Sequence, residues 1–129
     1  MMTCADHATW PVSSTYALPA SPASAHLARQ LTRGALSGRP DPLVDVAELL
    51  VSELVANAVR HATSAPIVRI EADGDSVWVA VQDASTKAPD VQDAGVDADG
   101  GRGLLLVDSL ATSWGWSKMP GGKRVWFTL

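Results

Sequence analysis

The sequence has almost no cysteine and too few basic residues to offset its acidic ones. Cys4 is the sole cysteine among 129 residues, which excludes an internal disulfide framework and a cysteine-based zinc site. The 14 acidic residues outnumber the 10 basic ones, and the net charge is −4. Because proteins that bind nucleic acid usually carry a basic face, this charge gives no support for direct binding to nucleic acid.

Long apolar runs are also missing. No run approaches the ~18 residues that a membrane-spanning helix requires. The first residues lack the basic patch and apolar core of a secretory signal. We therefore expect a cytoplasmic protein with no membrane partner. Hydrophobic residues still make up 47% of the chain and charged residues 19%, which is enough to bury the core of one domain.

The first half of the chain predicts a short strand and two helices. Residues 1–13 resemble a flexible N-terminal segment, and we expect one domain over residues 14–129, beginning with an edge strand over residues 14–18. Ser21, followed by a proline, is typical of a helix N-cap. Asp41, also followed by a proline, repeats this signal before a helical pattern of about twenty residues.

The second half is dominated by strand signals. Two β-rich runs, IVRIEA and DSVWVAVQD, flank an Asp-Gly pair, which predicts a hairpin. Residues 84–100 are small, polar and acidic and predict a long loop. GRGLLLVDSLA then predicts a short helix, and a PGG turn near the end predicts a second hairpin. This order of elements predicts the α+β class, a two-layer sandwich whose three helices cover one face of a mixed, mostly antiparallel sheet.

Three polar residues form a stripe along the second predicted helix, in the segment SELVANAVRHA. Glu53, Asn57 and His61 recur every four residues along the border of its apolar side. An asparagine oxygen suits Mg²⁺, and a glutamate one turn away could accept a proton from a hydroxyl group. Spacing alone favours a simpler interpretation than a ligand site, namely that the three residues are solvated at the edge of the helix. His61 would then be a cation that the helix dipole favours at the C-terminus.

Two further positions could bind a ligand. Asp83 ends a strand, where its carboxylate could accept a hydrogen bond from an exocyclic amine or could simply start a turn. Gly101 and Gly103 precede a helix N-terminus, which favours anions, although they could equally form a flexible joint. Arg102 between them could pair with phosphate or with the acidic loop before it.

Taken in order, these segments resemble the GHKL ATPase superfamily, and most closely the histidine-kinase-like ATPase domains of anti-sigma-factor serine/threonine kinases. The resemblance covers roughly residues 14–129, and its most specific parts are ELxxNAxxHA and GRGLxLV. It implies a Bergerat-type ATP-binding fold with ATP and Mg²⁺ as ligands. It also implies partner switching between a sigma factor and a STAS-type anti-anti-sigma protein. Dimers are common in that family, which leaves a homodimer open for this chain.

The resemblance also implies roles for individual residues. Asn57 matches the asparagine that holds Mg²⁺ on the ATP phosphates, and Glu53 matches the base that serves the acceptor hydroxyl. His61 closes the same motif near the phosphates. Asp83 matches the aspartate that reads the adenine amine.

The rest of the resemblance concerns the lid, the glycines and one arginine. Residues 84–100 match the ATP lid. Gly101 and Gly103 match the second glycine box beside the phosphates, and Arg102 falls between them. Arg29 on the first predicted helix resembles an arginine that lies near the partner surface in the serine kinases.

The chain departs from the family pattern at Ser85 and in its short, acidic lid, and both departures bear on ATP binding. The family usually has glycine two residues after the adenine aspartate, and this chain has Ser85 there. The leading hypothesis is a protein serine/threonine kinase that phosphorylates an anti-anti-sigma partner and sequesters a sigma factor. Ser85 and the acidic lid favour an alternative, a non-catalytic partner-binding module with a degenerate nucleotide pocket. A slow ATPase without a protein substrate needs the same pocket and stays open.

Overall fold

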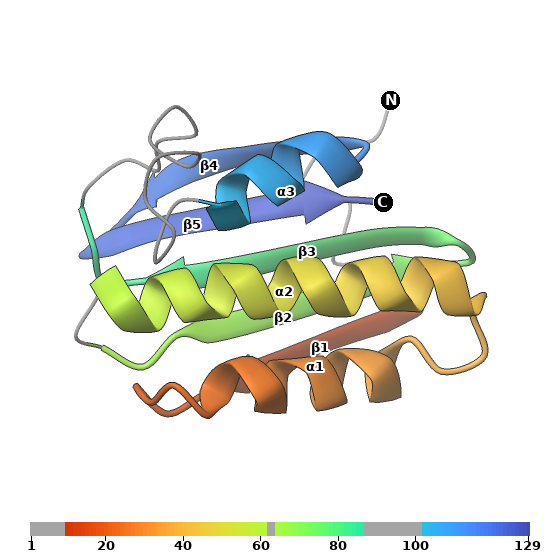
Figure 1. Cartoon of the computed structure of the whole chain (residues 1–129), viewed down its shortest axis with the longest axis horizontal. Coiled ribbons are helices and arrows are strands. Elements are labelled where there is room, and N and C mark those ends of the chain that lie inside the picture. Colours follow the sequence, from red (N-terminus) through yellow and green to blue (C-terminus); the bar gives the residue numbers. More distant parts are fainter. Residues whose placement is uncertain (1–9, 62–63, 87–101) are drawn as a thin grey trace.

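The computed structural model describes residues 10–61, 64–86 and 102–129. Within these ranges the chain forms five strands and three helices in two layers (Figure 1). The elements follow in this order: β1 (Val12–Ala17), α1 (Ser24–Ala35), α2 (Asp41–His61), β2 (Ile67–Asp73), β3 (Ser76–Asp83), α3 (Arg102–Leu110), β4 (Ser113–Met119) and β5 (Gly122–Thr128).

The strands form one sheet in the order β1-β2-β3-β5-β4, and all of these neighbours pair antiparallel. The helices lie side by side on one face, with α2 between α1 and α3 (Figure 1). The predicted α+β sandwich with three helices on one face is therefore confirmed. The described strands are antiparallel throughout, because hairpins join β2 to β3 and β4 to β5, and β5 then pairs antiparallel with β3.

The first strand and the first helix differ in their limits from the prediction. β1 begins at Val12 and not at residue 14. The Ser21 cap was wrong, because the N-cap position of α1 is Ala23, which makes no side-chain cap. The Ser21 hydroxyl instead accepts a hydrogen bond from the Ala23 N–H at 3.3 Å. It therefore stabilises the turn before the helix.

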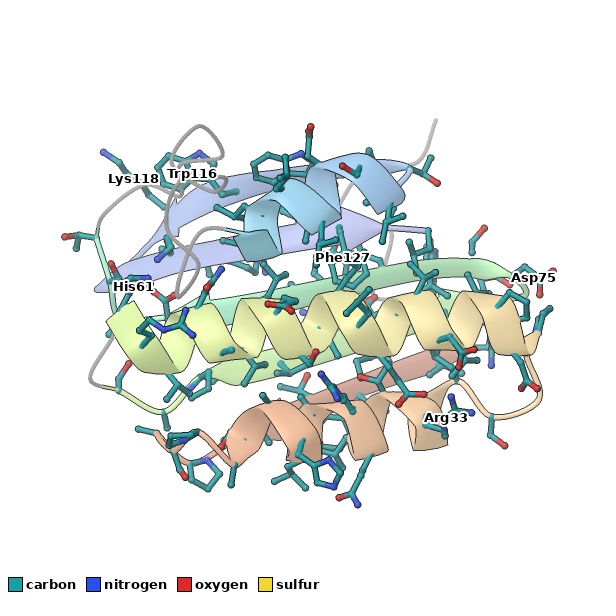
Figure 2. All side chains as sticks on the ribbon, in the orientation of Figure 1. Arg33, His61, Asp75, Trp116, Lys118 and Phe127 are labelled. Carbon is teal, nitrogen blue, oxygen red and sulfur yellow. The ribbon has the colours of Figure 1, made fainter. Side chains whose placement is uncertain are left out.

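Both predicted hairpins are present. Gly74 has a φ of 58° in the β2–β3 turn, and Gly121 has a φ of 76° in the β4–β5 turn. Glycine adopts this left-handed conformation at little cost, which explains its place in both turns. Figure 2 shows Asp75, in the first turn, at the opposite end of the molecule from His61, the last residue of α2.

The core lies between the sheet and the helices. Alternate residues of β3 and β5 face the helix layer, and each is at most 6% exposed: Val77, Val79, Val81, Val125 and Phe127. Burying an apolar side chain of this size stabilises the fold by about 1.5–3 kcal/mol. The same alternation places Asp83, which follows Val81, and Lys123, which precedes Val125, on the helix-covered side of the sheet.

The other face of the sheet carries two tryptophans. The guanidinium of Arg124 lies 5.6 Å from the ring centroid of Trp78, a cation–π contact. Trp126 is directly opposite Gly115 in the β4–β5 ladder, and a Cβ at Gly115 would come within 2.8 Å of the indole ring. Because Gly115 has no side chain, the Trp126 ring can lie over β4.

Exposed charges join α1 to α2. Arg33 forms ion pairs with Asp45, at 2.7 Å, and with Glu48. Hydrogen bonds, mainly to Glu48 and secondly to Asp45, raise the pKa of the Arg33 guanidinium above its usual value. About half of the Arg33 side chain is exposed, so solvent screens both pairs.

None of the helices in the described ranges is long and apolar enough to cross a membrane.

Candidate functional site

The polar stripe lies along the second half of α2. Glu53 and Asn57 are half-buried, and His61 is exposed at the last position of the helix. Residues four apart share one face of a helix, so the three side chains follow the same edge. Figure 2 shows His61 at the C-terminal end of α2. The stripe therefore runs from the border of the core out to solvent.

Asn57 has a cationic neighbour that sequence reasoning overlooked. Its Oδ1 accepts a hydrogen bond from Arg60 Nη1 at 3.2 Å. Arg60 is exposed in the last turn of α2, where a basic residue is usually explained by the helix dipole. The contact shows that the asparagine oxygen is accessible to a positively charged group. The i, i+3 spacing of the two residues was the available signal.

The described residues contain no group of three histidine, cysteine or acidic side chains able to hold a metal ion. From the described residues a cation at Asn57 would obtain the amide oxygen, and water and a bound substrate could supply further oxygen ligands. Mg²⁺ binds proteins in this way when it accompanies a polyphosphate. The donor set fits Mg²⁺ brought by a nucleotide better than a resident metal.

Asp83 is held by a lysine from the neighbouring strand. Lys123 is directly opposite it in the β3–β5 ladder, and Lys123 Nζ lies 3.1 Å from both Asp83 Oδ1 and Oδ2. Only 6% of the Asp83 side chain and 10% of the Lys123 side chain are exposed. A carboxylate buried to this extent needs a charged or hydrogen-bonding partner, and Lys123 supplies one.

Sequence reasoning missed Lys123 because a lysine after a turn reads as a solvated charge. The signal was its spacing from Val125 and Phe127, since residues two apart in a strand face the same side. Only the pairing of β3 with β5 brings it to Asp83, which lies 40 positions earlier.

Ser85 occupies the position where the family usually has glycine. Its backbone N–H donates a hydrogen bond to Asp83 Oδ1 at 2.8 Å, as in an Asx turn. No described residue other than glycine has a positive φ, so Ser85 fits here without the left-handed conformation. The serine therefore leaves the backbone able to orient the Asp83 carboxylate.

Gly122 lets β5 begin directly beside the end of β3. A Cβ at this position would overlap the Asp83 carbonyl oxygen and lie 2.9 Å from the Ala84 Cα. Both neighbours are backbone atoms, which cannot turn aside as a side chain can. The close approach therefore requires glycine at this position, a role beyond the turn that the PGG sequence predicted.

The remaining predicted residues are placed only in part. α3 is present, on the side of the molecule where α2 ends (Figure 1), but it begins at Arg102, so Gly103 lies within the helix and not before it as predicted. Gly101 and residues 87–100 of the proposed lid lie outside the described residues, as do the surroundings of the Arg102 side chain and of Gly103. Arg29 is exposed on α1, which α2 separates from α3.

Fold and polar groups together define the class of protein. An antiparallel sheet covered by three helices carries, at the helix-covered ends of β3 and β5, a buried acceptor and a buried cation. The amide and carboxylate of the α2 stripe occupy the C-terminal half of the helix above this sheet. Residues 18–129 match the family model described as the histidine kinase-like ATPase domain, and the chain belongs to this family. Nucleotide binding is what such an ATPase domain implies.

The fold is also similar to a solved structure. The crystal structure of the RsbU and RsbW domains of Rv1364c from Mycobacterium tuberculosis matches with a TM-score of 0.69 and 22% sequence identity. The match covers 90% of this chain and 31% of that chain, so the matched part spans about a third of the length of the chain in that structure. None of the curated proteins matches the sequence.

Proposed function

We propose that the protein is an ATP-dependent serine/threonine kinase that acts as an anti-sigma factor by partner switching. The observation that carries the proposal is the buried carboxylate of Asp83, which ends β3 on the helix-covered side of an ATPase-family sheet. Its proposed partners are a sigma factor and a STAS-type anti-anti-sigma protein. Arg29 on the exposed side of α1 is the proposed partner-binding residue.

The nucleotide-binding part of the proposal assigns one task to each polar group. Asp83 accepts a hydrogen bond from the exocyclic amine of adenine. Asn57 would hold Mg²⁺ through its Oδ1, the atom that accepts the hydrogen bond from Arg60. His61 and residues 101–103 complete the phosphate-binding side. The likeness in sequence to ELxxNAxxHA and GRGLxLV supports these tasks.

The catalytic part of the proposal rests on Glu53. When bound, ATP supplies the phosphoryl group that is transferred. Glu53 accepts the proton of the partner's serine hydroxyl, and its half-buried position beside Asn57 on the same edge of α2 suits a general base. A base of this kind typically contributes about 10²–10⁴-fold to the rate.

Glu53→Ala tests the catalytic role. We expect phosphorylation of a STAS-type partner to fall by about 10²-fold or more, while Mg-ATP affinity changes little. Transfer is measured as label from ATP on a partner serine, and affinity by calorimetry. Glu48→Ala is the matched control, because Glu48 lies on the same helix but pairs with Arg33. Wild-type transfer by the Glu53 variant would exclude Glu53 as the base.

One observation favours the non-catalytic alternative. Lys123 already contacts both oxygens of the Asp83 carboxylate. Adenine must therefore share that carboxylate with the lysine or displace the lysine. If calorimetry detected no binding at millimolar Mg-ATP, the kinase proposal would fail and a partner-binding module would remain. Phosphate release in the absence of any partner protein would instead support a slow ATPase.

A further inference from the structure

The Asp83–Lys123 pair needs an explanation beyond stability. Both side chains are about nine-tenths buried and face the helix-covered side of the sheet. Buried ion pairs stabilise a fold poorly, because both ions lose their hydration and their mutual attraction only partly compensates for that loss. Apolar residues at these positions would continue the valine series of β3 and β5. Burial of two charges here therefore points to a ligand.

The hydrogen-bonding capacity of the pair is only partly used. A lysine ammonium has three donors, and its contacts to the two Asp83 oxygens use at most two of them. The carboxylate has about four acceptor sites, and Lys123 and the Ser85 N–H fill three. In the described part of the chain neither group makes another hydrogen bond. One donor and one acceptor therefore remain, side by side.

We propose that Lys123 is a second residue that recognises adenine. It donates a hydrogen bond to the ring nitrogen beside the exocyclic amine, while Asp83 accepts a hydrogen bond from that amine. This inference rests on the proposed ATP binding. Adenine presents an amine donor next to a ring-nitrogen acceptor on each of two edges, through N1 or through N7. An adjacent acceptor and donor in the protein match either edge.

The ion pair also prepares Lys123 for this task. A free lysine side chain loses considerable rotamer entropy when a ligand fixes it. Here the two contacts at 3.1 Å and the burial already fix the ammonium. The third N–H can then bind a base with little further ordering. Both hydrogen bonds to the base involve a charged group, which makes them stronger than neutral ones.

The test compares ATP with two analogues in which either N1 or N7 is replaced by C–H. Calorimetry of the full chain with each Mg-nucleotide should show one analogue binding about 10-fold to 100-fold more weakly than ATP, because a charged hydrogen bond is lost. The affected analogue identifies the edge. Lys123→Met should lose ATP affinity by a similar factor and should bind ATP and that analogue equally.

Two further variants separate base reading from a structural role. Lys118→Met is the matched control, since Lys118 is exposed and directly opposite Lys123 in the β4–β5 ladder. It should keep the wild-type preference for ATP over the analogue. Lys123→Arg retains a donor and should restore that preference in part. A lysine that only supports the fold would lower the Tm without changing the ratio of the two affinities.

The outcomes are distinguishable. Equal wild-type affinity for ATP and both analogues would overturn the inference while leaving ATP binding intact. ATP affinity of Lys123→Met equal to or above wild type would also overturn it, and a rise would make Lys123 a competitor of the base. Absence of ATP binding to the wild type would overturn the proposed function and this inference with it. If Lys123→Met failed to fold, the wild-type analogue data and Lys123→Arg would still decide.

Discussion

Two groups of ion pairs hold different parts of this molecule, and they differ in their contact with water. Arg33 joins α1 to α2 through Asp45 and Glu48 at the surface. Asp83 and Lys123 join β3 to β5 beneath the helix layer. Water and salt screen the first group, whereas the second lost its hydration when the sheet formed. Burial, more than distance, therefore distinguishes these two groups of ion pairs.

The largest effect is expected when one member of the buried pair is removed. Asp83→Ala leaves the Lys123 ammonium buried without its partner, which typically costs about 3–5 kcal/mol of unfolding free energy. Urea unfolding measures this loss, and calorimetry should show that Mg-ATP binding is lost as well.

The double variant Asp83→Leu with Lys123→Met provides the complement. It replaces both charges by apolar groups, so we expect unfolding free energy equal to or above that of the wild type, without ATP binding. If Asp83→Ala cost no more than Asp45→Ala at the surface, the distinction between the two ion pairs would be wrong.

An intermediate effect is expected at Gly122. In Gly122→Ala the added Cβ meets the backbone of Asp83 and Ala84, so β5 must shift, and overpacking of this kind costs about 1–3 kcal/mol. Mg-ATP affinity should fall too, because the shift separates Lys123 from Asp83. Gly34→Ala is the control, since its Cβ would meet nothing within 4 Å. Unfolding and calorimetry of Gly122→Ala identical to those of Gly34→Ala would contradict the close approach.

The smallest effect is expected at the surface. Arg33→Ala removes two screened ion pairs, so its small loss of stability should shrink further at high salt. ATP affinity should equal that of the wild type, because none of the proposed nucleotide-binding residues lies on α1, and α2 lies between α1 and α3 (Figure 1). Urea unfolding at low and high salt provides the measurement. A loss that persisted at high salt would show that Arg33 does more than pair charges.

The sequence predicted most of the features that depend on neighbours along the chain. Glycine turns, a helix of twenty residues and the four-residue spacing of Glu53, Asn57 and His61 are local patterns. The Ser21 cap failed although it is local, because the serine could hydrogen-bond within a turn just as well. A short polar side chain has both options, and the packing of α1 decides between them.

Contacts between strands that are far apart in the sequence could not be predicted. Nothing near Lys123 in the sequence indicates that it meets Asp83, because the register of β3 against β5 fixes that contact. The clash at Gly122 is equally remote, since its neighbours are backbone atoms of β3. Roles proposed for Glu53, Asn57, Asp83 and Arg29 remain predictions that come from likeness to the family.

The strand order has a consequence for the synthesis of this protein. β4 is made before β5, yet it reaches the sheet only through β5, which lies between β3 and β4. A nascent chain that has emerged only as far as β4 therefore has Asp83 at an open strand edge without its lysine. The stripe on α2 is complete by then, but the Asp83–Lys123 pair is not. Nucleotide can bind as proposed only after the last described strand has been made and inserted.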